Sequence, residues 1–138
     1  MDLFANVNHL NDAISHATAP AFMLGAVASF LSILISRLER VADKRRALRT
    51  NPAADPNSEI GTSFARRMEL LSTAIAFAVL SALCTAGLLI GGFLAALLGV
   101  GHGTVMAGMF AIALVLLIAS LVNLAREMKI YMVHMHLE

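Results

Sequence analysis

The distribution of apolar and polar positions marks three long apolar segments along the chain. The first runs from Ala19 to Ser36, and a second stretch, from Leu70 to Ala125, contains no Asp, Glu, Lys or Arg. A helix crosses the bilayer core with about 20 apolar residues, so the second stretch has room for two crossings. The glycine-rich sequence GVGHGT, Gly99 to Thr104, marks the turn between them. The pattern therefore predicts an all-α integral membrane protein with three transmembrane helices.

The polar positions between these segments set the expected boundaries. Leu3, Val7, Leu10 and Ile14 recur at helical spacing near the N-terminus, which predicts an amphipathic helix at the outer interface. One membrane domain is expected, with these parts: outer amphipathic helix 2–16, first transmembrane helix with a basic extension 17–49, cytoplasmic linker 50–62, second transmembrane helix 63–98, outer turn 99–103, and third transmembrane helix with a cytoplasmic tail 104–136.

The second and third spans differ in the side chains that they offer to a neighbour. The second carries small residues at intervals of four, namely Ala74, Ala78, Ala82 and Ala86, followed by the glycine step from Gly87 to Gly91. Small residues let membrane helices approach closely, so this span is expected in the interior. The third span contains the bulkier sequence LVLLI and is expected to face lipid.

Polar and small residues form a seam along the first span, at alternating intervals of three and four. The seam consists of Ser15, Thr18, Phe22, Gly25, Ser29, Ser32 and Ser36. A 3.5-residue period indicates that one face of the helix meets other helices. In one interpretation the seam is a tight packing face whose hydroxyls bond to the preceding turn or to a neighbouring helix. In the other it is a wet face that lines a pore in an assembly, from Thr18 to Ser36, with Phe22 as a hydrophobic constriction.

The positions of the charged residues predict how the chain is oriented in the membrane. Of the 138 residues, 59% are apolar and 14% charged, and all ten Lys and Arg residues fall within Arg37–Arg49, Arg66–Arg67 or Arg126–Lys129. Short cytoplasmic loops collect Lys and Arg, so the N-terminus is expected outside and the C-terminus in the cytoplasm of a bacterial inner membrane. The formal net charge of +1 implies no attraction to nucleic acid.

The charged residues between Arg37 and Arg49 follow an order that membrane topology alone does not require. Arg40, Asp43 and Lys44 are spaced for helical ion pairs. The predicted cytoplasmic charge cluster consists of Arg37, Glu39, Arg40, Asp43, Lys44, Arg46, Arg66 and Arg67. In one interpretation Asp43, Arg40 and the Arg66–Arg67 pair form a salt-bridge clasp between the first two helices. In the other, the arginines bind a phosphate-bearing lipid or regulator, since guanidinium groups suit phosphate geometry. Anionic lipid is the expected cytoplasmic partner.

Three stretches, RLERVADKRRAL, RRMELLSTAI and MFAIALVLLIASLVNLARE, give the chain a resemblance to a known family. Over about residues 17–130 it resembles the bacterial family domain of unknown function 2721. The resemblance implies a three-helix inner-membrane protein and no established activity. The family's charged pattern falls on Arg37, Arg40, Asp43, Arg46, Leu48, Arg66, Arg67 and Glu127, and departs at Lys44, where the pattern has arginine.

Metal and catalytic chemistry find little support in the residue types. Among the histidines, only His16 has a potential ligand at helical spacing, Asp12, and two groups fall short of the three or four protein ligands of zinc sites. We expect no metal and no cofactor. No acidic or basic side chain lies between Leu70 and Ala125, and no phosphate loop or His-Glu metal motif occurs, so the chain is not expected to be an enzyme.

Two functions remain open. The first is a homo-oligomeric ion channel or small-solute pore of roughly four to six copies, a number that follows from helix diameters of about 10 Å around a narrow axis. The second is a non-conducting membrane scaffold or accessory subunit whose basic cytoplasmic face binds anionic lipid or a partner protein.

Overall fold

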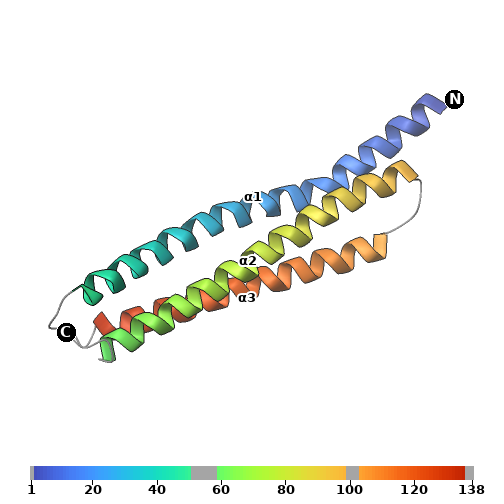
Figure 1. Ribbon diagram of the computed structural model, residues 1–138. Coiled ribbons are helices and arrows are strands. Elements are labelled where there is room, and N and C mark those ends of the chain that lie inside the picture. Colours follow the sequence, from blue (N-terminus) through green and yellow to red (C-terminus); the bar gives the residue numbers. More distant parts are fainter. Residues whose placement is uncertain (1, 51–58, 99–102, 136–138) are drawn as a thin grey trace.

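The computed structural model describes residues 2–50, 59–98 and 103–135. These residues form three long helices, α1 (Asp2–Arg49), α2 (Glu59–Leu98) and α3 (Gly103–Met135), which run up and down beside one another (Figure 1). Each helix contains a segment that is long and apolar enough to cross a membrane: Ala17–Leu48, Gly61–Leu98 and Gly103–Ile130. The predicted all-α fold with three transmembrane helices is therefore confirmed.

The helix boundaries differ from the expected ones by more than one residue at two places. α1 runs without a break through the segments 2–16 and 17–49, which were expected as two helices. Pro20 lies inside α1 and does not end it, because a proline removes one backbone hydrogen bond while long helical flanks hold the rest. α2 begins at Glu59, within the expected linker 50–62. The remainder of that linker, residues 51–58, and the turn residues 99–102 lie outside the described residues.

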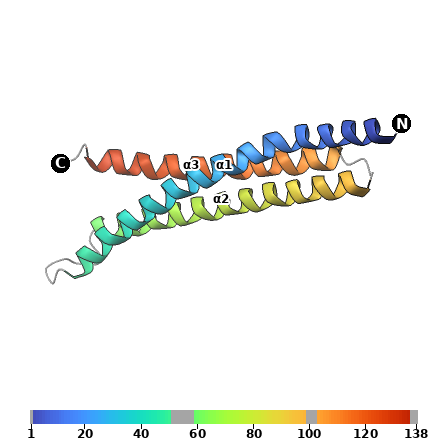
Figure 2. The ribbon, with the colours of Figure 1, turned by 90° about the horizontal axis from the view of Figure 1, so that it is seen from above.

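α2 is the central helix of the bundle. It packs against both α1 and α3, whereas α1 and α3 barely meet (Figures 1 and 2). The buried share of the membrane-spanning window is 28% in α2, 22% in α1 and 11% in α3. The expectation that the second span packs in the interior is confirmed, and α3 is the most exposed of the three spans.

The contact line of α2 explains which small residues meet a neighbour. Its buried positions recur at intervals of three and four from Leu71 to Leu88, with Ala95 seven residues further, and are Leu71, Ala74, Ala78, Ser81, Thr85, Leu88 and Ala95. Helices that wind around each other keep positions with a 3.5-residue period in contact. The contact line therefore departs after Ala78 from the series of small residues at intervals of four. Gly87 and Gly91 are exposed, and a Cβ placed on either would meet no atom within 4 Å.

Two serines bond α2 to α3 in the middle of the bundle. The hydroxyl of Ser81 in α2 donates to the carbonyl oxygen of Ala113 at 2.8 Å, and the hydroxyl of Ser120 in α3 donates to the carbonyl oxygen of Ala74 at 2.6 Å. Both serines are fully buried. An apolar side chain in a membrane gains about as much from contact with lipid as from contact with another helix. Hydrogen bonds such as these, together with close packing, therefore hold membrane helices together.

Candidate functional site

The polar seam of α1 faces away from the rest of the chain. Pro20, Val27, Leu34 and Val41 lie seven residues apart and are buried on the side of α1 that packs against α2. The predicted pore-lining residues Thr18, Phe22, Gly25, Ser29, Ser32 and Ser36 are all exposed, on the opposite side. Among the residues that the structure describes, the seam therefore faces neither α2 nor α3.

Three hydroxyl groups of the seam bond within α1. Ser15 donates to the carbonyl oxygen of Asn11, Thr18 to that of Ile14, and Ser29 to that of Gly25, at 2.9, 2.9 and 3.1 Å. This pattern was one of the expected alternatives, the bond to the preceding turn. A hydroxyl that donates to a carbonyl keeps its acceptor lone pairs, so these groups still present oxygen atoms to the outside.

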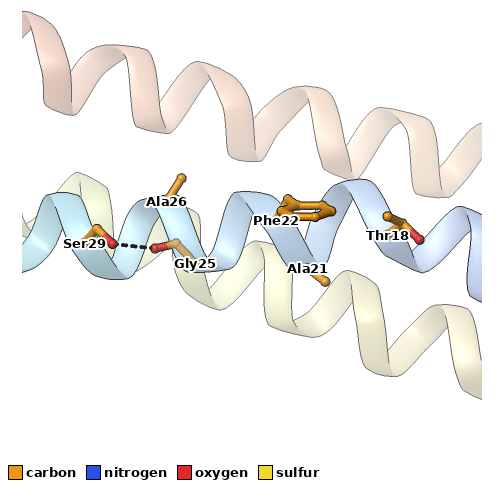
Figure 3. A pocket seen from close by; sticks show the side chains of 6 residues that line it. All are labelled: Thr18, Ala21, Phe22, Gly25, Ala26 and Ser29. Atoms are coloured by element: carbon orange, nitrogen blue, oxygen red, sulfur yellow. Dashed lines mark hydrogen bonds between the residues drawn. The ribbon is translucent and has the colours of Figure 1, made fainter.

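An open hollow of about 650 Å³ lies on the N-terminal half of this seam. Its lining residues are Thr18, Ala21, Phe22, Gly25, Ala26 and Ser29, all from α1 (Figure 3). The side chain of Phe22 is the large one among them, and Phe22 is 77% exposed. Gly25 provides empty space, because a Cβ placed there would meet no atom within 4 Å. A projecting aromatic ring and an unfilled depression thus share one helix face.

A second feature, an ion-pair cluster, joins all three helices near the other end of the bundle. The guanidinium group of Arg67 in α2 donates through Nε and Nη2 to Oε1 of Glu127 in α3, at 2.9 and 2.6 Å. Nη1 of Arg37 in α1 lies 3.4 Å from Oε2 of the same carboxylate. Both arginines belong to the predicted charge cluster, and Glu127 is the carboxylate that brings them together.

Burial makes the contacts of this cluster unequal. The side chain of Glu127 is 1% exposed, that of Arg67 14% and that of Arg37 37%. The Arg67 guanidinium also lies 5.8 Å above the ring centroid of Phe64, a cation–π distance. A buried carboxylate needs a partner with good geometry. The two short bonds from Arg67 supply it, whereas the longer contact with Arg37 ties α1 to α3, two helices that otherwise barely meet.

The ion pairs differ from those expected for a clasp around Asp43. Asp43 lies 4.0 Å from Arg46 within α1, and its side chain is 75% exposed. Arg67 is directed to Glu127 instead, and Glu39, Arg40, Lys44 and Arg66 are exposed. The physical reason is reach: Arg46 is three residues from Asp43 on the same helix, while Arg67 has a buried carboxylate closer at hand on α3. The clasp between helices exists, but Glu127 rather than Asp43 is its acid.

A known protein family matches the chain across all three helices. Residues 17–135 match the family described as Protein of unknown function (DUF2721). The chain belongs to this family. The matched range of DUF2721 includes the whole seam from Thr18 to Ser36 as well as Arg37, Arg67 and Glu127. No curated protein and no solved structure matches the chain.

Glu127 was absent from the residues predicted for the site, although the resemblance to DUF2721 named it. A signal was available in the sequence, because Ala113, Ser120 and Glu127 lie seven residues apart and would share one helix face. That face is buried in α3. The Asp12 and His16 side chains lie outside the described ones, and among the described residues no group of three or more His, Cys, Asp or Glu could hold a metal ion.

Proposed function

We propose that this DUF2721 protein forms a homo-oligomer in the bacterial inner membrane and conducts ions or small solutes along a path lined by the seam of α1. The observation that carries the proposal is the exposure of the entire seam on the side of α1 that faces away from α2. One chain cannot enclose a path, since α2 fills the space between α1 and α3. Copies arranged around an axis can, and roughly four to six helices of about 10 Å diameter fit around a narrow one.

The chemistry of the seam suits such a path. Thr18, Ser29, Ser32 and Ser36 would become rings of hydroxyl groups around the axis, and the ring of Phe22 would form the narrow apolar point near the outer mouth. Hydrophobic constrictions gate pores by excluding water, and hydroxyl oxygens offer an ion polar contacts that do not hold it tightly. The proposal assigns no catalytic residue, metal or cofactor.

The cytoplasmic end of the seam carries both signs of charge. Glu39, Asp43 and Arg46 continue the seam beyond the membrane, and Arg40 and Lys44 lie beside them, all exposed. The mixture predicts no selectivity for cations or anions. The basic residues of this stretch suit anionic lipid, which attracts a Lys or Arg near the membrane surface by about 1 kcal/mol.

The orientation is tested by the accessibility of an added cysteine. With Cys84 replaced by serine, a cysteine at Asn6 should react with a membrane-impermeant maleimide in intact cells, because the positive charges retain residues 37–67 in the cytoplasm. A cysteine at the exposed Lys44 serves as the matched control and should react only after lysis. The reverse labelling pattern would contradict an outside N-terminus.

Conduction is tested with the purified protein in liposomes. Phe22→Ser should increase ion leak several-fold over wild type, because a hydroxyl at the constriction no longer excludes water, while Ser29→Leu should reduce the leak by adding bulk to the path. Dye-reported potassium or proton flux measures both. The control is Val115→Ser, an equally drastic change at an exposed apolar position of α3 that should leave the flux unchanged. Flux equal to that of empty liposomes in both wild type and Phe22→Ser would contradict conduction.

A non-conducting scaffold or accessory subunit is the second candidate. It is favoured by the hydroxyl bonds within α1, since a hydroxyl bonded to its own helix can also face lipid or another helix. In this case the exposed basic residues Arg40, Lys44 and Arg46 would bind anionic lipid or a partner protein. Binding to vesicle lipids without any flux in the liposome assay would favour this function.

A further inference from the structure

A second stripe along α1, separate from the seam, changes from apolar to basic near the ion-pair cluster. It consists of Phe30, Ile33, Arg37, Arg40 and Lys44, at alternating intervals of three and four. Residues at these intervals share one face of a helix. The apolar half lies on the membrane side and the basic half beyond it. A phospholipid has its parts in the same order, acyl chains followed by a charged phosphate.

The contact between Arg37 and Glu127 shows where this stripe faces. Nη1 of Arg37 lies 3.4 Å from Oε2 of Glu127, so the stripe is on the flank of α1 that is nearest to α3. α1 and α3 barely meet, however, and Ile33, Arg40 and Lys44 are exposed. Among the described residues, the basic half of the stripe therefore has no helix over it.

The ion-pair cluster itself contains more positive than negative charge. The guanidinium groups of Arg37 and Arg67 share the single carboxylate of Glu127. Arg67 makes the two short bonds to it, and Arg37 is the more exposed of the two arginines. A guanidinium group has five N–H donors, and Arg37 uses one of them in a bond to a described residue. The cluster can therefore accept a further anion at Arg37.

The neighbouring cations of the stripe add to this excess. None of the ion pairs between described residues includes Arg40 or Lys44. The excess persists when the acids of the stretch are counted, because residues 37–49 contain six Lys and Arg residues and two acidic ones. Arginine forks match the oxygen atoms of a phosphate group, and lysine contributes as a point charge.

We propose that Arg37, Arg40 and Lys44 bind the phosphate of an anionic phospholipid, whose acyl chains lie along Phe30 and Ile33. A lipid is the source of the phosphate because the basic half of the stripe continues directly into apolar side chains, and Ile33 is 53% exposed. The inference deepens the lipid partner of the proposed function and rests on its orientation, which puts this end of α1 at the cytoplasmic leaflet. It depends on neither self-association nor conduction.

Lipid titration of the purified protein tests the site. Phosphatidylglycerol is added to the protein in a neutral detergent, and native mass spectrometry gives the fraction of lipid-bound protein. Arg40→Gln and Lys44→Gln should each weaken binding about five-fold, the effect of one cation near an anionic head group. Both side chains are exposed and outside the ion-pair cluster, so the fold should be retained. Arg37→Gln should weaken binding further, with the thermal unfolding of each variant measured alongside.

Lys129→Gln is the matched control, because it removes the same charge from the same end of the bundle. Lys129 is exposed on α3, two residues from the buried Glu127 and therefore on another face of that helix. Binding of phosphatidylglycerol should be unchanged in this variant. A loss equal to that of Lys44→Gln would mean that the lipid responds to the overall positive charge, which would overturn the site.

Two further probes separate charge and source. Phosphatidylcholine, whose choline group offsets the phosphate charge, should bind the wild type several-fold more weakly than phosphatidylglycerol, and equal binding would overturn the charge recognition. Inorganic phosphate at the same concentration should not displace phosphatidylglycerol, and displacement would assign the site to free phosphate. Ion flux in liposomes without selective lipid binding would leave conduction in place and overturn only this site, whereas selective binding without flux would contradict only conduction.

Discussion

Replacing Arg67 by methionine should lower the free energy of unfolding by about 3–5 kcal/mol, the usual cost of leaving a buried charge without its partner. Glu127 is 1% exposed and receives its two short hydrogen bonds from Arg67. After the substitution the carboxylate retains the 3.4 Å contact with Arg37, which is longer and partly open to solvent. Methionine preserves much of the apolar stem, so the loss reflects the charge and not the volume.

A double variant separates the ion pair from packing. Arg67→Met with Glu127→Leu removes both charges, and apolar replacement of a whole buried pair is often neutral. We therefore expect the double variant to be more stable than Arg67→Met alone. Thermal unfolding in detergent, followed by circular dichroism, gives the comparison. If the two substitutions destabilise additively, Arg67 and Glu127 are not coupled.

An exposed ion pair of the same chain provides the control. Asp43 lies 4.0 Å from Arg46, and both side chains are largely exposed. Exposed pairs contribute about 0–1 kcal/mol, so Asp43→Asn should leave the unfolding transition almost unchanged. A loss as large as that of Arg67→Met would show that Asp43 has a partner beyond the contacts of the described residues.

The fold followed from the sequence because the features that determine it are local. Segments of about 20 apolar residues can satisfy their backbone groups in a bilayer only as helices, and glycine clusters and charge mark where they end. The central position of α2 also followed, from Ala74 and Ala78. The course of its contact line beyond Ala78 did not, since it depends on how the helices wind around one another and not on residue size alone.

The two parts of the candidate site were predictable to different degrees. The α1 seam could be read from its period, because the residues that form it lie on one helix. Which side of α1 it occupies relative to α2 was open until the buried positions Val27 and Leu34 were known. The Arg37–Arg67–Glu127 cluster joins Glu127 to arginines that lie 60 and 90 positions away on the other two helices, so local spacing favoured Asp43 as the acid instead.

Ser120→Leu should separate α2 from α3 and destabilise the bundle by about 3 kcal/mol, from overpacking plus a lost hydrogen bond. Ser120 is fully buried, and its hydroxyl lies 2.6 Å from the carbonyl oxygen of Ala74, which is itself buried. A leucine adds bulk where the two helices are in contact. Because Glu127 lies seven residues further along the same face of α3, the displacement should also loosen its bonds to Arg67.

Three variants distinguish the steric effect from the hydrogen bond. Ser120→Ala removes only the hydroxyl and should cost about 1 kcal/mol, in the range of interhelical hydrogen bonds in membranes. Ala125→Leu adds the larger side chain at an exposed position of α3 and should change little. Combining Ser120→Leu with Arg67→Met should cost less than the sum of the two, since the first already weakens the bonds that the second removes. Full additivity in detergent unfolding would mean that the helix contact at Ser120 does not position Glu127.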